Sequence, residues 1–477
     1  MSTTSHNSNN KGAVKLSYSL IVKGTGFTSY NREKVAILEE ALFFIDDRGV
    51  IAEVIESSDS SYQDMLAKYE QSENYQALSE TEYLLPGMVD LHIHAPQWAQ
   101  SGTALDIPLA DWLNTYTFPL EAKYSDLEYA NRVYSDLVSQ LLSVGTTTAL
   151  YFATVHQEAS YRLAEICATK GQRGLVGKVV MDDPQQNPEY YRDASTAAAL
   201  AETETFIQRV QDLHKRTRQG VYPVVTPRFI PSCTDDALAG LGELAAKYDV
   251  HIQSHCSESD WEHGYVKERF GKNDAFALDD FGLLADKAVM AHCNHLTKED
   301  AQLFADTGTA IAHCPISNAY FANGVIPLQE YATDYQVEIG LGTDISGGFS
   351  KSIFDNIKQA VISSRILEDG VDTRLASHER GVPKSRITLN EAFYHATAGG
   401  GQALSLPIGK LVKGYAWDAL VLKTDVPEAR LPIFDQKEEL TDIFQKLIYM
   451  SQGANIRKVW VQGQLVHTKG ETNGNHN

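Results

Sequence analysis

Short apolar and β-branched runs alternate with amphipathic segments through the middle of the chain. Segments with helical spacing of apolar residues, such as 126–144, 194–218 and 235–247, separate most of these runs. Eight strands that alternate with helices predict a parallel sheet, and eight such units favour a closed (β/α)₈ barrel, the TIM barrel, over the alternative of an open doubly wound sheet. The eight runs are 88–93, 146–152, 174–180, 221–226, 250–254, 288–291, 309–312 and 338–341.

The two ends of the chain have a different pattern, because both contain short strands with few helical segments between them. We predict that both ends build one small composite β-sandwich domain from residues 13–84 and 405–470, with the barrel at residues 85–404. A polar stretch at 57–82 interrupts the first part and predicts a surface helix or loop, and residues 1–12 predict a disordered tail. The expected strands are 16–23, 41–53, 419–422, 458–461 and 464–467.

Composition narrows the classes of function. The formal net charge of -21 argues against non-specific nucleic-acid binding and favours a small ligand such as a free base or nucleoside. No apolar run is long enough for a membrane span, and the polar N-terminus lacks the apolar core of a secretory signal. The five cysteines form no C-x-x-C pair, which suits reduced thiols, so we expect a cytoplasmic protein.

The strongest chemical signal lies at the end of the first expected barrel strand, in the segment PGMVDLHIH at residues 86–94. Side chains alternate between the two faces of a strand, so His92 and His94 point to the same side. Two imidazoles at one strand end can reach one metal ion. Alone, such a pair is often incidental.

Four later strands also end in candidate ligands, namely His255, His292, His313 and Asp344. The carboxyl ends of barrel strands surround one mouth, where barrel active sites lie. Three neutral imidazoles and one carboxylate suit Zn²⁺ with room for a water, whose pKa the ion lowers to about 7. We predict one Zn²⁺ per chain and expect that His292 does not bind it but orients the nucleophile or substrate. In the alternative assignment, His292 or His313 binds the metal. The chosen ligands are His92, His94, His255 and Asp344.

Glu258 follows His255 by three residues, in the loop beyond the strand. A carboxyl group beside an activated water can take its proton and pass it to a ring nitrogen or a leaving amine. Cys256, Cys293 and Cys314 directly follow candidate histidines, but successive strand residues face opposite ways. We therefore expect these thiols to pack against helices and not to bind the metal.

Other motifs are missing from the sequence. There is no G-x-G-x-x-G or P-loop at a strand–helix junction, which leaves nucleotide-cofactor binding without support. There is also no P-C-x-x-C, which disfavours the zinc site of cytidine deaminases.

These residues resemble the amidohydrolase superfamily and, within it, the guanine deaminases. The resemblance covers most of residues 85–400 and runs through LPGMVDLHIH, QSHCSE, AHC and GTDISGG; the segment TPRF at 226–229 and Gly347-Gly348 are more particular to the guanine deaminases. In that family the segment after the second histidine typically reads Ser before Gln and Tyr after it. Here Pro96 and Trp98 stand at those positions, which bears on the pocket wall.

The resemblance implies hydrolysis of guanine to xanthine and ammonia, a step of purine catabolism, by a homodimer. It implies the same four zinc ligands, Glu258 as proton shuttle, Asp344 as a further acid/base, and His292 as a stabiliser of the attacking group. It assigns purine binding to Gln97, Arg228, Phe229, His255, Glu258 and Asp344.

Alternative functions are a related hydrolase acting on a triazine, cytosine or adenine derivative, and a barrel scaffold without catalysis. Some superfamily members bridge two metals with a carboxylated barrel lysine; we interpret Lys178 as a structural residue or one that supports the site.

Overall fold

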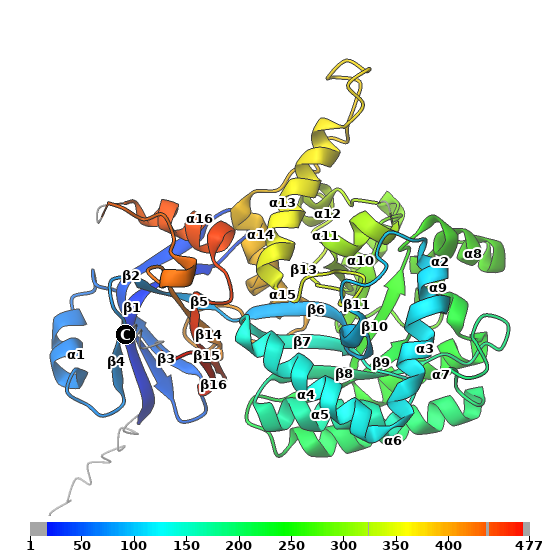
Figure 1. The fold of residues 1–477 in the computed structure, drawn as a ribbon, viewed down its shortest axis with the longest axis horizontal. Helices are drawn as coiled ribbons and strands as arrows, with labels where there is room; N and C mark the ends of the chain where they lie inside the picture. The colour runs from blue at the N-terminus through cyan, green and yellow to red at the C-terminus, as the bar shows by residue number, and fades with distance from the viewer. Residues whose placement is uncertain (1–16, 323, 436–437, 471–477) are drawn as a thin grey trace, which may run out of the picture.

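The computed structural model describes residues 17–322, 324–435 and 438–470, so the tail predicted at residues 1–12 lies outside the described part. Two eight-stranded sheets form the framework. One belongs to a small β region and the other to a larger α/β region beside it (Figure 1).

The smaller sheet combines strands from both ends of the sequence, in the order β16-β15-β14-β5-β1-β2-β3, with β4 paired to β1. The two ends of the chain meet where β5 and β14 pair antiparallel, with Leu85 opposite Leu420. This confirms a composite β region, whereas its predicted boundaries stay predictions. The strands are β1 (Tyr18–Ser29), β2 (Val35–Asp46), β3 (Ile51–Ile55), β4 (Tyr75–Ala77), β5 (Glu82–Pro86), β14 (Ala419–Lys423), β15 (Ile456–Val461) and β16 (Gln464–Thr468).

One expected strand in this region was wrong in extent. Residues 41–53 do not form a single strand, because the chain turns between β2 and β3. Asp46 closes that turn: its Oδ1 accepts the backbone N–H of Arg48 at 2.9 Å and of Val50 at 3.0 Å. The polar stretch at 57–82 contains a surface helix, α1 (Tyr62–Tyr69), and also contributes β4 to the sheet.

The second sheet is the predicted barrel. Its eight strands follow one another in sequence order, all neighbours are parallel, and each lies within a few residues of a run predicted from the sequence. Hydrogen bonds from Asp344 N to His92 O and from His94 N to Ile345 O, both 2.8 Å, join the last strand to the first. The strands are β6 (Met88–His94), β7 (Thr146–Phe152), β8 (Arg173–Val180), β9 (Val221–Pro227), β10 (His251–Cys256), β11 (Ala288–His292), β12 (Ala310–His313) and β13 (Ile339–Leu341).

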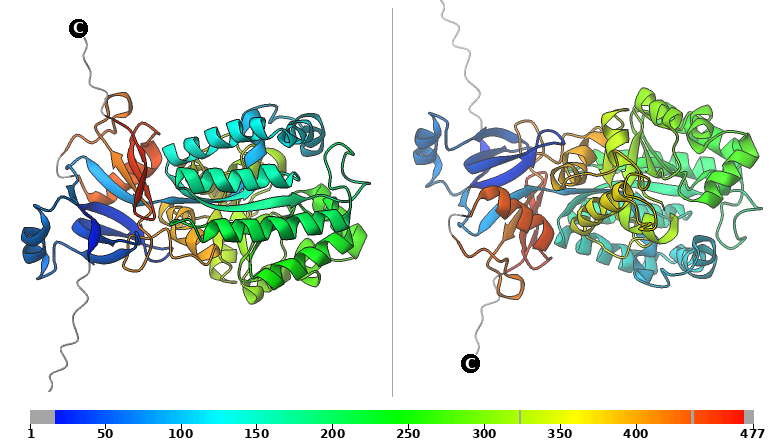
Figure 2. Two further views of the ribbon diagram at one scale, coloured as in Figure 1. Left: turned by 90° about the horizontal axis from the view of Figure 1, so that it is seen from below. Right: turned by 90° about the horizontal axis from the view of Figure 1, so that it is seen from above.

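Helices surround the barrel strands on the outside (Figure 2). Their ends follow local capping: Asp126, for example, accepts the N–H groups of Glu128 and Tyr129 at the start of α4. The helices after α1 are α2 (Leu109–Trp112), α3 (Phe118–Glu121), α4 (Leu127–Ser143), α5 (Gln157–Lys170), α6 (Thr196–His214), α7 (Asp235–Tyr248), α8 (Asp260–Phe270), α9 (Asp274–Asp280), α10 (Lys298–Thr307), α11 (Pro315–Ser317), α12 (Leu328–Thr333), α13 (Ile353–Asp369), α14 (Leu389–Ala396), α15 (Ala398–Ala403) and α16 (Leu440–Met450).

A buried ion pair joins the two regions. The Arg173 guanidinium, at the start of β8, pairs with the carboxylate of Asp418, next to β14. The same guanidinium donates to Gln462 Oε1 at 2.6 Å, and Asp418 Oδ1 accepts the backbone N–H of Gln462 at 2.7 Å. The composite sheet is therefore anchored to the end of the barrel opposite the predicted site.

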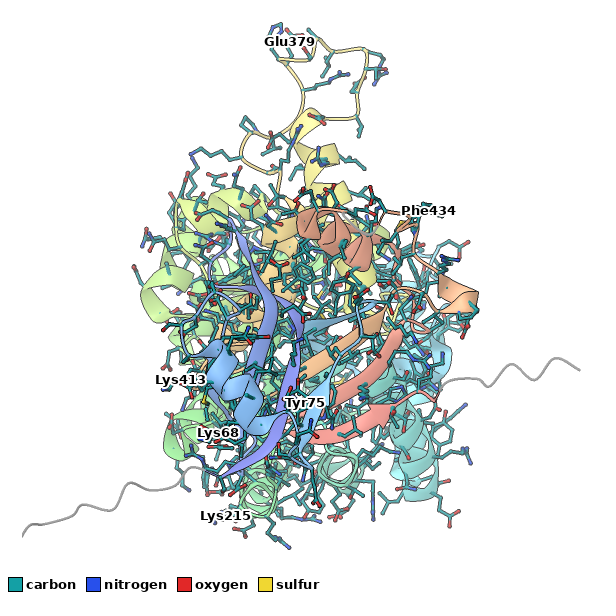
Figure 3. All side chains as sticks on the ribbon, turned by 90° about the vertical axis from the view of Figure 1, so that its left-hand side faces the viewer. Lys68, Tyr75, Lys215, Glu379, Lys413 and Phe434 are labelled. Carbon is teal, nitrogen blue, oxygen red and sulfur yellow. The ribbon has the colours of Figure 1, made fainter. Side chains whose placement is uncertain are left out.

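Helix α13 leads into a loop that projects from the body of the molecule, with Glu379 at its tip (Figures 1 and 3). Several apolar side chains on this projection are exposed, among them Ile362, Ile366 and Val371. Among the described residues, no helix has the length and apolar content needed to cross a membrane.

Candidate active site

The barrel brings five of the predicted polar side chains to one mouth. His92 and His94 come from the end of β6, His255 from β10, His292 from β11, and Asp344 follows β13. All five residues are buried.

Asp90 ties the first and last strands together beneath these side chains. Its carboxylate accepts the N–H of Thr343 at 2.9 Å and the hydroxyl of Thr343 at 2.6 Å. Burial raises the pKa of Asp90 to about 7, while the two bonds from Thr343 oppose that shift. The ends of β6 and β13 are thus held in register, and with them His92, His94 and Asp344.

Nitrogen and oxygen atoms of these side chains converge closely. His94 Nε2 lies 3.0 Å from His255 Nε2, and Asp344 Oδ1 lies 3.3 Å from His92 Nε2 and 3.6 Å from His94 Nε2. His255 Nδ1 lies 2.5 Å from the carbonyl oxygen of Arg228, which can only accept. The Nδ1 of His255 is therefore the protonated nitrogen, and its Nε2 presents a lone pair to His94.

Burial keeps the imidazoles neutral. It lowers the pKa of His92, His94 and His255 well below the usual value for histidine, and the neighbouring histidines lower it further. His92 Nε2 is buried without a hydrogen-bond partner. Neutral imidazole nitrogens and a carboxylate oxygen that converge this closely fit a bound divalent cation.

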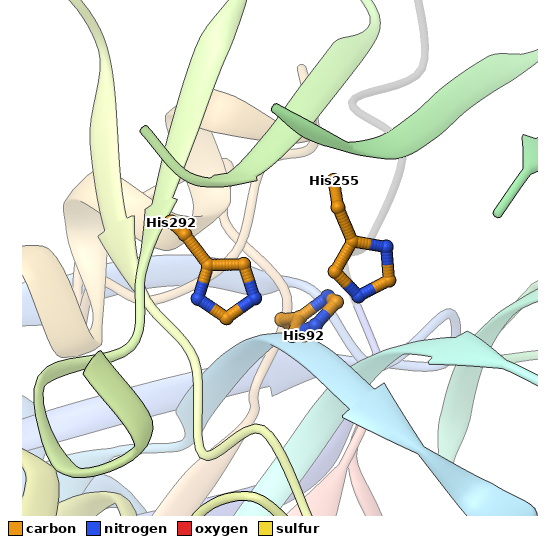
Figure 4. A group of neighbouring side chains, drawn as sticks. All are labelled: His92, His255 and His292. Atoms are coloured by element: carbon orange, nitrogen blue, oxygen red, sulfur yellow. The ribbon is translucent and has the colours of Figure 1, made fainter. Parts of the chain in front are cut away.

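Two overlapping groups among the described residues could hold a metal. One is His92, His94 and Asp344; the other is His92, His255 and His292, shown in Figure 4. Because His92 belongs to both, the groups describe one centre. His313 belongs to neither; both its ring nitrogens are buried without partners, and burial lowers its pKa to about 3. Neither group includes a cysteine, and the five cysteines are free and buried.

The backbone at this mouth is strained. Asp344, His292, Cys293 and Ser257 all have positive φ, between 49° and 70°. Such conformations cost about 1–3 kcal/mol each in non-glycine residues and concentrate at functional sites. Close packing also explains the glycine at 347, because a Cβ there would lie 2.8 Å from Asp344 Oδ2.

Glu258 lies beside this centre on the loop after β10. Its Oε1 is 3.6 Å from His292 Nε2, and its side chain is 13% exposed, so it is screened from bulk water. Burial, and then the charge of Asp344, raises the pKa of Glu258 to about 8. A carboxyl group with a pKa near neutrality can both accept and return a proton.

A chain of amide side chains connects Glu258 to His292. Asn294 Nδ2 donates to the carbonyl of Glu258 at 3.0 Å, and Asn318 Nδ2 donates to Asn294 Oδ1 at 2.9 Å. Asn318 Oδ1 in turn lies 2.8 Å from His292 Nδ1. Because that oxygen only accepts, His292 carries its proton on Nδ1 and leaves Nε2 facing Glu258.

One cavity at the mouth is lined by all six residues predicted to bind the purine: Gln97, Arg228, Phe229, His255, Glu258 and Asp344. Its outer wall is aromatic. The rings of Phe229 and Trp261 lie 5.8 Å apart, and those of Trp112 and Phe321 lie 5.1 Å apart. A flat, partly apolar ring with polar edges fits such walls.

Comparisons with known proteins agree with this arrangement. The amidohydrolase family model matches residues 83–466. The guanine deaminase of Mus musculus is 38% identical over 457 residues, covering 94% of this chain and 96% of its own, and that of Dictyostelium discoideum is 36% identical over 464 residues, covering 94% and 98%. The chain belongs to the amidohydrolase family, in its guanine deaminase branch. A crystal structure of guanine deaminase from C. acetobutylicum with guanine bound in the active site superposes with a TM-score of 0.83, at 32% identity, over 94% of this chain and 100% of that one.

Pro96 and Trp98, the two residues expected to bear on the pocket wall, make their hydrogen bonds to Tyr124 and Asp136. The Pro96 carbonyl accepts the Tyr124 hydroxyl at 2.8 Å, and Trp98 Nε1 donates to Asp136 Oδ2 at 2.7 Å. Neither residue is among the described residues that line the cavity.

Lys178 is fully buried and lies 2.6 Å from the carboxylate of Asp193. An ammonium group that is already paired in this way supports the interpretation of Lys178 as structural.

The sequence alone did not reveal two parts of this amidohydrolase site. One is Glu121, a buried carboxylate bonded to Arg228 and Gln97. The other is the apolar wall from Leu109, Trp112, Trp261 and Phe321. Glu121 lies in a four-residue helix within a long connection, with no motif around it, and aromatic residues in loops have no characteristic spacing.

Proposed function

We propose that this protein hydrolyses guanine to xanthine and ammonia. The observation that carries the proposal is the single cavity in which the His/Asp centre and Glu258 face Gln97 and Arg228. The 32% identical C. acetobutylicum enzyme, solved with guanine in its active site, supports guanine as the substrate.

We assign one Zn²⁺ per chain to His92, His94, His255 and Asp344, with His292 as the alternative ligand. The fit rests on the neutral, buried imidazoles and on His92 Nε2, which has no hydrogen-bond partner. When bound, Zn²⁺ supplies a water whose pKa is lowered to about 7. The two candidate groups share His92, which favours one ion over two.

The protein's own groups then move protons. Glu258 takes a proton from the attacking water through a carboxylate oxygen and delivers it to ring nitrogen N3, as the water oxygen bonds to C2. Asp344 and Glu258 pass the second proton to the amine, the bond from C2 to that nitrogen breaks, and ammonia leaves. Water and guanine thus give xanthine and ammonia. His292 Nε2, 3.6 Å from Glu258 Oε1, orients the attacking group.

Substrate selection depends on hydrogen bonds that guanine can form in the cavity and that other rings cannot. Arg228 and Gln97 are 3% and 2% exposed, so a missing partner in the substrate would leave their donors buried and unpaired. Such a mismatch can cost a factor of about 10⁴ in selectivity. Phe229 forms an apolar wall for the ring face.

The direct test measures ammonia release from guanine, adenine, cytosine and a triazine with the purified protein, alongside its zinc content. We expect turnover of guanine alone and about one zinc per chain. Turnover of another ring with guanine untouched would refute guanine as the substrate, and an inactive, metal-free protein would favour the scaffold alternative.

We also infer that the enzyme is a cytoplasmic homodimer. The free, buried cysteines suit a reducing compartment. Ile362 and Ile366 lie one turn apart on α13, each 50% exposed, and Val371 beyond them is 76% exposed. An apolar row of this kind is typical of a protein interface. Light scattering of the wild type and of Ile366→Glu tests the dimer, which the substitution should weaken.

A further inference from the structure

Glu121 is the last residue of α3 and is completely buried beside the cavity. Its carboxylate forms two bonds with one guanidinium: Oε2 accepts from Arg228 Nη1 at 2.7 Å and Oε1 from Arg228 Nη2 at 3.2 Å. Oε1 also accepts from Gln97 Nε2 at 2.9 Å. One carboxylate therefore holds Arg228 and Gln97, two of the polar side chains that we assign to the purine.

These bonds fix the direction of Gln97. Its Nε2 faces Glu121, and its Oε1 accepts the backbone N–H of Ser346 at 3.2 Å. Because an acceptor stands on one side and a donor on the other, a flipped amide would break both contacts. These protein contacts thereby hold Gln97 in a single orientation.

The Arg228 guanidinium is held on two sides. The Glu121 carboxylate pairs with the terminal nitrogens of the guanidinium, and the centre of the Phe118 ring lies 5.2 Å from the guanidinium carbon. A guanidinium has five N–H donors, and Glu121 takes two of them, so donors remain available. The charge of Arg228, however, is already balanced within the protein.

We propose that Glu121 is a positioning and specificity residue, which aims Arg228 and Gln97 at the base and cancels the arginine charge. This rests on the proposed function. A buried, unpaired guanidinium would attract an anionic ligand strongly, because opposite charges interact far more in a poorly solvated site than in water. With Glu121 in place, the same guanidinium acts as a hydrogen-bond donor to a neutral ring, which suits a free purine base.

The test compares Glu121→Gln with a matched control, Glu128→Gln, whose carboxylate is exposed at the start of α4. For Glu121→Gln we expect KM for guanine to rise about 10- to 100-fold, the loss of roughly one charge-assisted hydrogen bond. The kcat should change much less, and its pH profile should keep its shape, because Glu258 is untouched. The control should behave as the wild type does.

A second readout distinguishes specificity from general damage. Urate, an anionic purine, should inhibit Glu121→Gln at least about tenfold more strongly than it inhibits the wild type, because Arg228 has lost its balancing charge. A structural defect would weaken the binding of every purine, neutral and anionic alike. Weaker urate inhibition in the variant would overturn the proposal.

A double-mutant cycle keeps the test decisive if Glu121→Gln is poorly folded. Glu121→Gln, Arg228→Gln and the double variant are compared after their zinc content is matched. Because Glu121 acts partly through Arg228, the double variant should be clearly less impaired than the product of the two single effects. Multiplied effects would refute this route. A wild type inactive on guanine would instead refute the proposed function, so the two failures are distinguishable.

Discussion

His395 makes the stability of the barrel depend on pH. The side chain lies in α14 and is 2% exposed, and its Nδ1 is 2.8 Å from the carbonyl oxygen of Ile339 in β13. Burial lowers the pKa of His395 from 6.5 to about 4, with a further contribution from Arg32, although the bond to Ile339 opposes the shift. The unfolded chain therefore binds this proton at a higher pH than the folded protein does.

The sign and size of the effect follow from that difference. Stability from a neutral His395 is fully present above about pH 6.5 and is lost as the pH falls towards about 4. Over the whole window the loss is about 3 kcal/mol, and between about pH 7 and about pH 5.5 it is about 1 kcal/mol.

The matched variant is His395→Gln, which keeps an N–H donor for Ile339 but does not titrate. Urea unfolding of both proteins at about pH 7 and about pH 5.5, followed by circular dichroism, measures the free energy of unfolding. The wild type should lose about 1 kcal/mol more than the variant, since the other buried histidines contribute equally to both. Equal losses would show that His395 is not the buried neutral group described above.

Three further predictions concern the site and its support. Glu258→Gln should keep its metal but lower kcat by about 10²- to 10⁴-fold, because an amide cannot take up and release a proton near neutral pH; a loss below tenfold in steady-state assays would count against the proton shuttle. Removing the metal with a chelator should abolish activity and lower Tm in a thermal melt, with both restored by Zn²⁺; an unchanged melt would argue against a metal at the His/Asp centre. Asp418→Ala leaves Arg173 buried without its carboxylate and should cost about 3–5 kcal/mol in urea unfolding, whereas a cost under about 1 kcal/mol would mean that this ion pair does not hold the two regions together.

The sequence predicted the barrel well, for a physical reason. Parallel barrel strands are buried on both faces, so they appear as continuous runs of apolar and β-branched residues such as 146–152, which matches β7 at both ends. The candidate ligands also followed from position, since His92, His255 and His292 stand at or next to strand ends. The strand expected at 41–53 was too long, because its middle contains the polar turn Asp46-Asp47-Arg48-Gly49, in which Gly49 has positive φ.

The partners of these side chains could not be predicted. Glu121 meets Arg228 across 107 positions of sequence, and no local pattern records that contact. The tautomers of His255 and His292 likewise depend on a carbonyl and an amide supplied by distant segments. The spacing of residues along the chain identifies side chains that lie at the same end of the barrel. The donor and acceptor in each hydrogen bond can be assigned only from the three-dimensional structure.

The pairing of β5 with β14 has a consequence during protein synthesis. Leu84 and its neighbours leave the ribosome more than three hundred residues before Val421, which pairs with Leu84 in the finished sheet. Until then, the N-terminal strands present an open edge that could pair with another nascent chain. Translation delayed late in the message should therefore favour aggregation, and a chaperone that shields strand edges should raise the yield of folded enzyme.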